Sequence, residues 1–283
     1  MFFTEKRNCS IFFLAIFVIL LATSCSTGPP APKMGTPPFY WGAAGETFAK
    51  ADYLKTADHL EQLVKTDNEY TQRALPWRLV LTAGMAKSQA ELADIFEAGS
   101  RANRGNPTPF RRQMTELRTM AGRRALQFAE TFLKFSGHDH TQDIPLDFVF
   151  PTGNANKPLE LEKIGNGVPP SETQVESVRR RSIERGVLLA TCAAVGAPED
   201  VAKAQSIFKA GNVKVPHDVF ALAMVKYLQD QAQLFSRTKL DQPERLELFC
   251  NQALAALKTV KPSKETKDLT AKIEKTLKSA KPK

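Results

Sequence analysis

Apolar side chains recur at helical spacing along most of the chain from residue 39 onward. In ADYLKTADHLEQLVK, apolar residues three or four positions apart form one stripe, which predicts an amphipathic helix. The members of this stripe are Tyr53, Ala57, Leu60, Leu63 and Val64. Two longer helical runs follow, one from about Pro76 to Gly99 and one from Phe110 to about Gly137. Pro76 suits a first helical turn, where no N–H partner is lost.

The pattern changes between residues 138 and 170. Here IPLDFVF and KPLELEKIG alternate or cluster apolar residues beside Pro and Gly, which indicates one or two short strands or an extended crossing segment. Helical spacing resumes at Ser171, where Gln174 completes a capping box. A further helix is expected to begin at Pro198, and three more reach the Lys-rich end of the chain.

Together these patterns predict an all-α fold of about nine helices with little sheet. We expect an N-terminal helical half over residues 39–137 and a C-terminal half over residues 171–283, joined by the 138–170 segment.

The first 24 residues have the pattern of an export signal. Lys6 and Arg7 precede IFFLAIFVILLAT, a run of thirteen uncharged and almost wholly apolar residues. As a helix rising about 1.5 Å per residue, this run spans roughly 20 Å, which is shorter than the ~30 Å hydrocarbon core of a bilayer. The short apolar run with small residues at its end favours a signal peptide over a membrane-spanning helix.

The end of this leader, LATSC, resembles the lipobox of bacterial lipoproteins, in which small residues precede a lipidated cysteine. Ala22 departs from the leucine that the family most often has there. The resemblance implies lipid on the Cys25 sulfur and cleavage before Cys25, since two or more acyl chains hold a soluble domain at a membrane. By the same resemblance, Ser26 favours the outer membrane, with the protein facing the periplasm. The alternative is an ordinary signal peptide with an incidental cysteine.

Residues 25–38 include STGPPAPKMGTPP, which has five prolines and predicts an extended tether between the lipid anchor and the helical body.

The segment ADYLKTADHLEQLVKTDN resembles the second half of a tetratricopeptide repeat (TPR), although four positions depart from the family's usual residues: Ala51, Thr56, Leu63 and Asn68. A weaker match runs from Gly186 to Pro216. The resemblance implies a TPR-like array of helical hairpins with a concave surface for a protein or peptide. A helical bundle without repeats is the alternative.

The chain carries a net charge of +9, and one dense basic group lies in VRRRSIER. Its members are Arg179, Arg180, Arg181 and Arg185. They form either a basic strip that faces an anionic partner or a solvated helix face partly offset by Glu176 and Glu184. No aromatic residues interleave the arginines, and an exported lipoprotein would rarely meet nucleic acid, so we expect no nucleic-acid partner.

Cys192 and Cys250 are the two cysteines of the helical body. They either pair as a disulfide or remain as buried free thiols on helix faces.

The sequence offers no catalytic constellation, and we expect no enzyme activity, metal, cofactor or small-molecule substrate. His138 and His140 in GHDH lie near Asp143, but too few other histidines and cysteines accompany them for a metal site. Walker, dinucleotide-binding and H-E-x-x-H motifs are absent from the sequence. The sequence therefore favours a lipid-anchored envelope scaffold that binds a protein or peptide. The alternative is an envelope enzyme or ligand-binding protein with its site in residues 138–170.

Overall fold

The computed structural model describes residues 32–137 and 142–280. The predicted leader, Cys25 and the first half of the predicted tether lie outside the described residues, as do His138 and His140. Residues Met34–Lys283 form one compact unit. Because this unit holds both hydrophobic clusters of the structure, we expect it to fold without the segment that precedes it.

The described chain begins with a helical hairpin of α2 (Pro37–Ala49) and α3 (Tyr53–Lys65), which pack against each other. Ala51 turns the chain between them with a left-handed φ of 57°, and the Asp52 carboxylate caps α3 by accepting a hydrogen bond from the Lys55 N–H. The apolar stripe predicted from Tyr53 to Val64 is buried, so this helix is confirmed.

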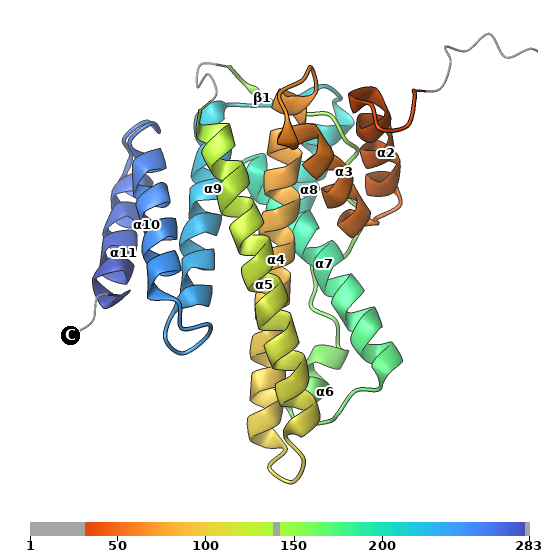
Figure 1. Ribbon diagram of the computed structural model, residues 1–283, viewed down its shortest axis with the longest axis vertical. Coiled ribbons are helices and arrows are strands. Elements are labelled where there is room, and N and C mark those ends of the chain that lie inside the picture. The colour runs from red at the N-terminus through yellow and green to blue at the C-terminus, as the bar shows by residue number, and fades with distance from the viewer. Residues whose placement is uncertain (1–31, 138–141, 281–283) are drawn as a thin grey trace, which may run out of the picture. The chain divides into compact units, whose positions relative to one another are not determined.

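Two long helices, α4 (Thr71–Ala102) and α5 (Thr108–Ser136), run side by side through the centre of the unit (Figure 1). Helix α4 begins at Thr71, so the predicted start at Pro76 is wrong and this proline lies inside the helix. An internal proline costs about 3 kcal/mol because it removes a helical hydrogen bond. The helix nevertheless continues because Leu75, Pro76 and Trp77 are all buried, and packing decides helix stability more than local propensity does.

Residues 142–170 contain one short strand and one short helix. Strand β1 (Ile144–Leu146) pairs antiparallel with β2 (Val213–Val215), so the strand predicted in IPLDFVF is confirmed. The strand predicted in KPLELEKIG is wrong, because its last six residues form helix α6 (Glu160–Gly165). Leu161 and Ile164, three positions apart, are buried, whereas Leu159 is 82% exposed. Helical rather than alternating burial therefore governs this segment.

The segment between β1 and α6 is held against three different helices. Asp147 accepts a hydrogen bond from Arg73 at 2.6 Å, and the backbone carbonyl of Thr152 accepts one from the Tyr53 hydroxyl at 3.3 Å. Arg185 donates to the carbonyl of Ala155 at 2.8 Å. These contacts fix the crossing segment over α3, α4 and α7.

Helix α7 (Glu172–Ala194) begins with the predicted capping box: the Ser171 hydroxyl accepts from the Gln174 N–H, and the Gln174 side chain accepts from the Ser171 N–H. Helix α8 (Val201–Lys209) begins three residues after the predicted start at Pro198. The difference arises because Glu199 has a left-handed φ of 65° and Asp200 caps the helix.

The chain ends with α9 (His217–Ala232), a 3₁₀ turn (Gln233–Phe235), α10 (Pro243–Leu257) and α11 (Lys264–Ala280). Helix α10 packs against α9, and α11 packs mainly against α10. The described residues thus hold ten α-helices and one two-stranded sheet, which confirms the all-α prediction. The TPR-like arrangement of these helices is not confirmed.

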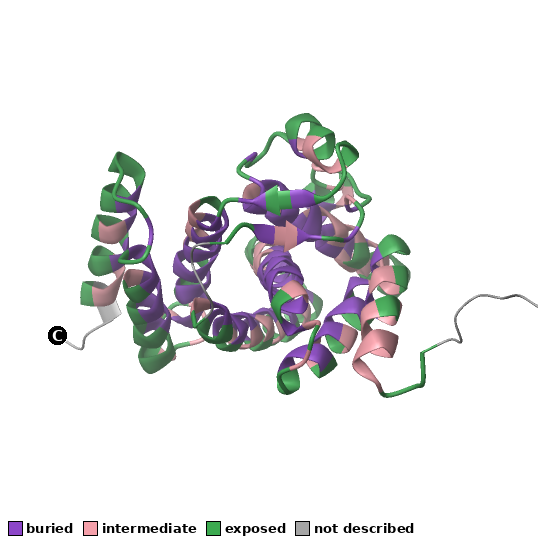
Figure 2. Cartoon of the chain, turned by 90° about the horizontal axis from the view of Figure 1, so that it is seen from above, coloured by how far each residue is buried: buried purple, intermediate pink, exposed green. Residues whose placement is uncertain are grey.

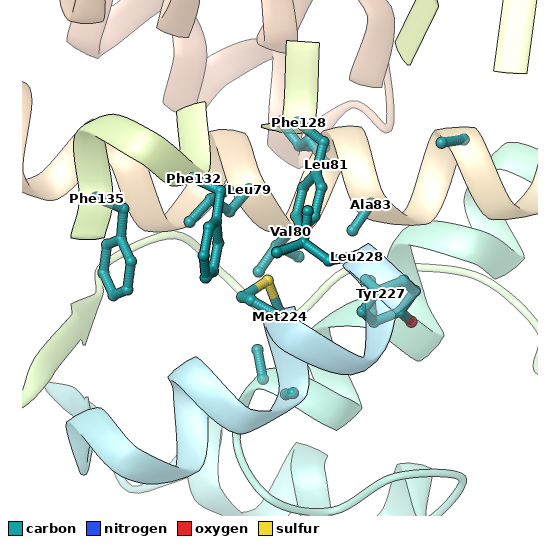
Figure 3. Packing of buried hydrophobic residues seen from close by; sticks show 14 of the residues in the cluster. Leu79, Val80, Leu81, Ala83, Phe128, Phe132, Phe135, Met224, Tyr227 and Leu228 are labelled. Carbon is teal, nitrogen blue, oxygen red and sulfur yellow. The ribbon is translucent and has the colours of Figure 1, made fainter. Parts of the chain in front are cut away.

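The core lies between α4, α5, α7 and α9, whose inward faces are buried (Figure 2). Phenylalanines of α5 and aliphatic residues of α4 meet Met224 and Leu228 of α9 (Figure 3). A smaller hydrophobic cluster joins the C-terminal part of α4 and the N-terminal part of α5 to α6 and α7. Within the described residues, no helix combines the length and hydropathy needed to cross a bilayer.

Helices α4 and α7 cross at a pair of glycines. A Cβ built on Gly186 would lie 2.3 Å from the Gly84 carbonyl oxygen, and one built on Gly84 would lie 2.6 Å from the Gly186 carbonyl oxygen. Only residues without a side chain allow the two backbones to approach this closely. The glycine pair therefore sets how closely α4 and α7 approach each other.

Candidate functional site

A groove of about 460 Å³ lies between α7 and α9, and we call it the α9 groove. Helix α9 supplies one continuous face to it, at positions spaced by three or four residues. These positions are Val219, Leu222, Ala223, Lys226, Tyr227 and Asp230. Helix α7 supplies Leu189 and Ala193, while Lys87 of α4 and Glu265 of α11 also line the groove.

Several residues that line the α9 groove are small or apolar. Ala193 and Ala223 leave room between the helices, and Val219 is 37% exposed although it belongs to a packed helix. The opposite face of α9 is fully engaged, since Phe220, Met224 and Leu228 are all buried in the core. The groove side of α9 is only partly packed: Val219 and Leu222 are partly exposed there, whereas Ala223 is buried.

Charged groups of both signs border the groove. Lys87 forms an ion pair with Asp230 at 3.5 Å, and its ammonium lies 5.5 Å from the centre of the Tyr227 ring. Lys226 pairs with Glu265 of α11. These side chains are all about half exposed, so each pair stabilises the fold by less than about 1 kcal/mol and can exchange partners with a bound molecule.

The turn between α7 and α8 lines one side of the groove with Gly196 and Glu199. Both residues have a left-handed backbone conformation, with φ of 73° and 65° respectively. A Cβ built on Gly196 would lie 2.9 Å from a methyl carbon of Val219. Glycine is thus needed here both for the backbone conformation and for the close approach to α9.

Tyr227 lines the groove and is a buried residue with a hydroxyl group. Burial, followed by the nearby Asp230 carboxylate, raises the pKa of Tyr227 well above its ordinary value. The phenol therefore stays protonated at neutral pH and offers a hydrogen-bond donor to an occupant of the groove.

The four arginines predicted as contacts for an anionic partner are mostly paired within the protein. Arg179 binds Glu116 of α5 at 2.7 Å, and Arg181 binds Glu160 at 2.9 Å. Arg185 binds Glu91 of α4 at 2.8 Å. Arg180, by contrast, is 73% exposed and lies 3.8 Å from Glu184. Three of the four thus join α7 to its neighbours, which the spacing of the arginines could not reveal.

Arg179 and Arg180 also line a hollow of about 450 Å³ between α7 and the turn before α3. Lys50 is the third cation there, and three carboxylates, those of Asp52, Glu176 and Glu184, balance them in number. The hollow has no excess of positive charge, so its lining does not favour an anion over a cation.

Cys192 of α7 and Cys250 of α10 are both free and buried, so the disulfide considered from the sequence is not formed in the structure. Burial raises the pKa of each thiol to about 11. A protonated, buried thiol is a poor nucleophile, which agrees with a packing role.

The alternative site in residues 138–170 is only partly within the described residues. Asp143 lines a hollow of about 290 Å³ with Arg73 of α4 and Lys214 of β2, whereas His138 and His140 lie outside the described residues. Where the structure is described, no three or more His, Cys, Asp or Glu side chains lie close enough to hold a metal ion.

The α9 groove was not singled out from the sequence, although the sequence holds a signal for it. HDVFALAMVKYLQDQA places apolar residues on more than one helical face, as a helix does when it packs on one side and lines a groove on another. No family model, curated protein or solved structure matches the chain.

Proposed function

We propose that this protein is a lipid-anchored scaffold of the cell envelope, which binds a protein or peptide segment along the α9 groove. In this proposal the Cys25 sulfur carries the lipid, the chain is held at the outer membrane and faces the periplasm, and it catalyses no reaction. The groove between TPR-like helix pairs would be the partner surface.

The observation that supports this proposal is the partly exposed apolar surface that α9 and α7 present to the groove. Half-exposed valine and leucine side chains beside two alanines form a hollow that an apolar side chain of a partner can fill. Burying such a side chain contributes about 1.5–3 kcal/mol. The Tyr227 hydroxyl and the ion pairs at the border supply the polar contacts that orient a bound segment.

Photo-cross-linking in intact envelopes tests the groove directly. A photoreactive amino acid replaces Leu222, which lines the groove, and in a matched control it replaces Leu248, which is exposed on α10 outside the groove. We expect a discrete cross-linked protein from position 222 and none from position 248. The same products from both positions would contradict the proposal.

A substitution that fills the groove with a large side chain complements the cross-linking experiment. Ala193→Trp places a large ring in the groove, whereas Ala255→Trp places the same ring on the exposed surface of α10. We expect Ala193→Trp to abolish the cross-link from Leu222 while the circular dichroism spectrum stays that of the wild type. An undiminished cross-link in a folded Ala193→Trp variant would refute binding in the groove.

The lipid anchor has a separate test. A fatty-acid probe added to growing cells should label the wild-type protein but not Cys25→Ala. Equal labelling of the two proteins would rule out lipidation at Cys25 and leave the α9 groove proposal unaffected.

A second candidate function, an envelope enzyme or ligand-binding protein with its site in residues 138–170, is favoured by the hollow that Asp143 shares with Lys214. A metal analysis of the purified protein tests it, because one bound zinc or iron per chain would support this candidate over the scaffold.

A further inference from the structure

The outer face of α11 is densely basic. Five lysines of this helix are exposed, and none of them has an ion-pair partner among the described residues. We call these residues the lysine face: Lys264, Lys267, Lys272, Lys275 and Lys278. Figure 1 shows α11 at the edge of the unit, where it packs mainly against α10.

The five lysines project from one side of the helix. At about 100° per residue they fall within an arc of about 140°, opposite the side that packs on the protein. The packed side contains Thr266, Leu269 and Ile273, which are all buried. Lysine side chains on this outer face therefore extend into solvent along about 20 Å of helix.

The lysine face belongs to the most basic part of the chain. Residues 258–283 contain nine lysines and three acidic residues, a net charge of +6, whereas the whole chain carries +9. Of the three acids, Glu265 is paired with Lys226 of α9, and only Asp268 lies within the arc of the lysines. Two thirds of the net charge of the chain is thus carried by its last 26 residues.

We propose that the lysine face docks on the surface of a lipid bilayer that presents anionic headgroups. The partner is identified by charge complementarity, since basic helix faces are attracted to a negatively charged bilayer surface. This inference goes beyond the scaffold function and depends neither on lipid at Cys25 nor on an occupant of the α9 groove.

The composition of the face favours a bilayer over nucleic acid or a specific acidic peptide. All five cations are lysines, which act as hydrated point charges, whereas arginine is the residue that recognises phosphate or carboxylate with a fixed two-pronged geometry. The arc contains no aromatic side chain on which a base could stack. The face is also the convex side of a helix, which suits a broad surface better than an extended chain.

Vesicle sedimentation tests the proposal with residues 34–283, which form a compact unit with its own core. The vesicles contain either equal parts of phosphatidylglycerol and phosphatidylcholine or phosphatidylcholine alone. We expect binding to the anionic vesicles only, weakening as salt is raised because the attraction is screened. Equal binding to both kinds of vesicle, or binding to neither, would overturn the proposal.

Two triple variants with the same change in net charge locate the surface. The first replaces Lys267, Lys272 and Lys275 by glutamine, which keeps helix propensity high. Each lysine near an anionic bilayer strengthens binding about fivefold, so this variant should bind about 100-fold more weakly. The control replaces Arg104, Arg111 and Arg112, which are exposed where α4 turns into α5, by glutamine.

We expect the arginine control to bind anionic vesicles within about twofold of the unmodified unit, because its arginines lie around the turn between α4 and α5, which Figure 1 shows well away from α11. Equal losses in the two variants would show that net charge rather than the lysine face drives binding, and would overturn the proposal. Binding to a soluble polyanion such as a single-stranded oligonucleotide with no binding to vesicles would likewise overturn it. Circular dichroism confirms that both variants are folded.

Discussion

The glycine crossing of α4 and α7 predicts a large effect for a single added methyl group. In Gly186→Ala the new Cβ would lie 2.3 Å from the Gly84 carbonyl oxygen and 2.8 Å from the Cβ of Ser88. Real Cβ atoms do not approach other heavy atoms this closely, and the nearest atom here belongs to the backbone. The overlap can therefore be relieved only if the two helices move apart.

The magnitude follows from two opposing contributions. Overpacking a well-packed core costs about 1–3 kcal/mol, and the upper part of this range applies because a helix backbone must shift. Alanine in place of glycine stabilises a helix by about 0.5–1 kcal/mol. The net expectation for Gly186→Ala is a loss of about 2 kcal/mol, which for a domain of this size lowers the melting temperature by about 4–8 °C.

Gly42→Ala is the matched control, because Gly42 is exposed within α2 and has no neighbouring atom within 4 Å of an added Cβ. This substitution should stabilise the protein by up to about 1 kcal/mol through helix propensity alone. Thermal unfolding of residues 34–283, followed by circular dichroism, compares the variants. If Gly186→Ala melts at or above the temperature of the unmodified unit, the close crossing is refuted.

Two further predictions concern titratable groups. Burial would raise the pKa of Glu97, but its hydrogen bonds and charge interactions with Arg101 and Arg118 outweigh burial and hold the pKa below its ordinary value. Its stabilising contribution is therefore present above the unfolded pKa and is lost as the pH falls through the folded pKa, over about pH 5 to 3. We expect urea unfolding of Glu97→Gln to lose less stability over this range than the wild type; equal losses would contradict the assignment. Cys192 and Cys250, each with a pKa of about 11, should not react with a thiol reagent in the native unit at neutral pH and should both react once it is unfolded in urea. Rapid modification of the native protein would show that one thiol is accessible.

Local signals in the sequence predicted the elements whose formation depends on neighbouring residues. The capping box at Ser171 and Gln174 defines the start of α7 in both sequence and structure, because its hydrogen bonds span only three residues. The stripe from Tyr53 to Val64 was predicted for the same reason, since a single apolar face needs only one partner surface.

The sequence-based prediction is wrong for elements whose form depends on contacts with distant residues. The sequence predicts a helix start at Pro76, but the burial of Trp77 and its neighbours among residues from the rest of the chain keeps the helix continuous through the proline. The alternating LELE predicts a strand, whereas α4 offers a surface that Leu161 and Ile164 cover as a helix. The spacing of apolar residues in a short segment does not show which distant segments will bury it.

The candidate site, too, depends on contacts between distant segments that the sequence does not reveal. The arginines of α7 were visible as a charged group, but their partners Glu91, Glu116 and Glu160 lie in three other elements. The α9 groove is lined by residues of α4, α7, α9 and α11, whose relative positions the sequence does not predict. Only the spread of apolar residues around α9 can be recognised from the sequence.

The central position of α4 has a consequence for how the unit opens. This helix contacts α3, α5, α6, α7, α9 and β1, so its amides cannot be exposed without separating it from all of these elements. In a linear repeat array each unit contacts only its neighbours and can fray alone. Here the amides of α4 should exchange with deuterium only through global unfolding, whereas those of α11, which packs mainly on α10, should exchange through local opening.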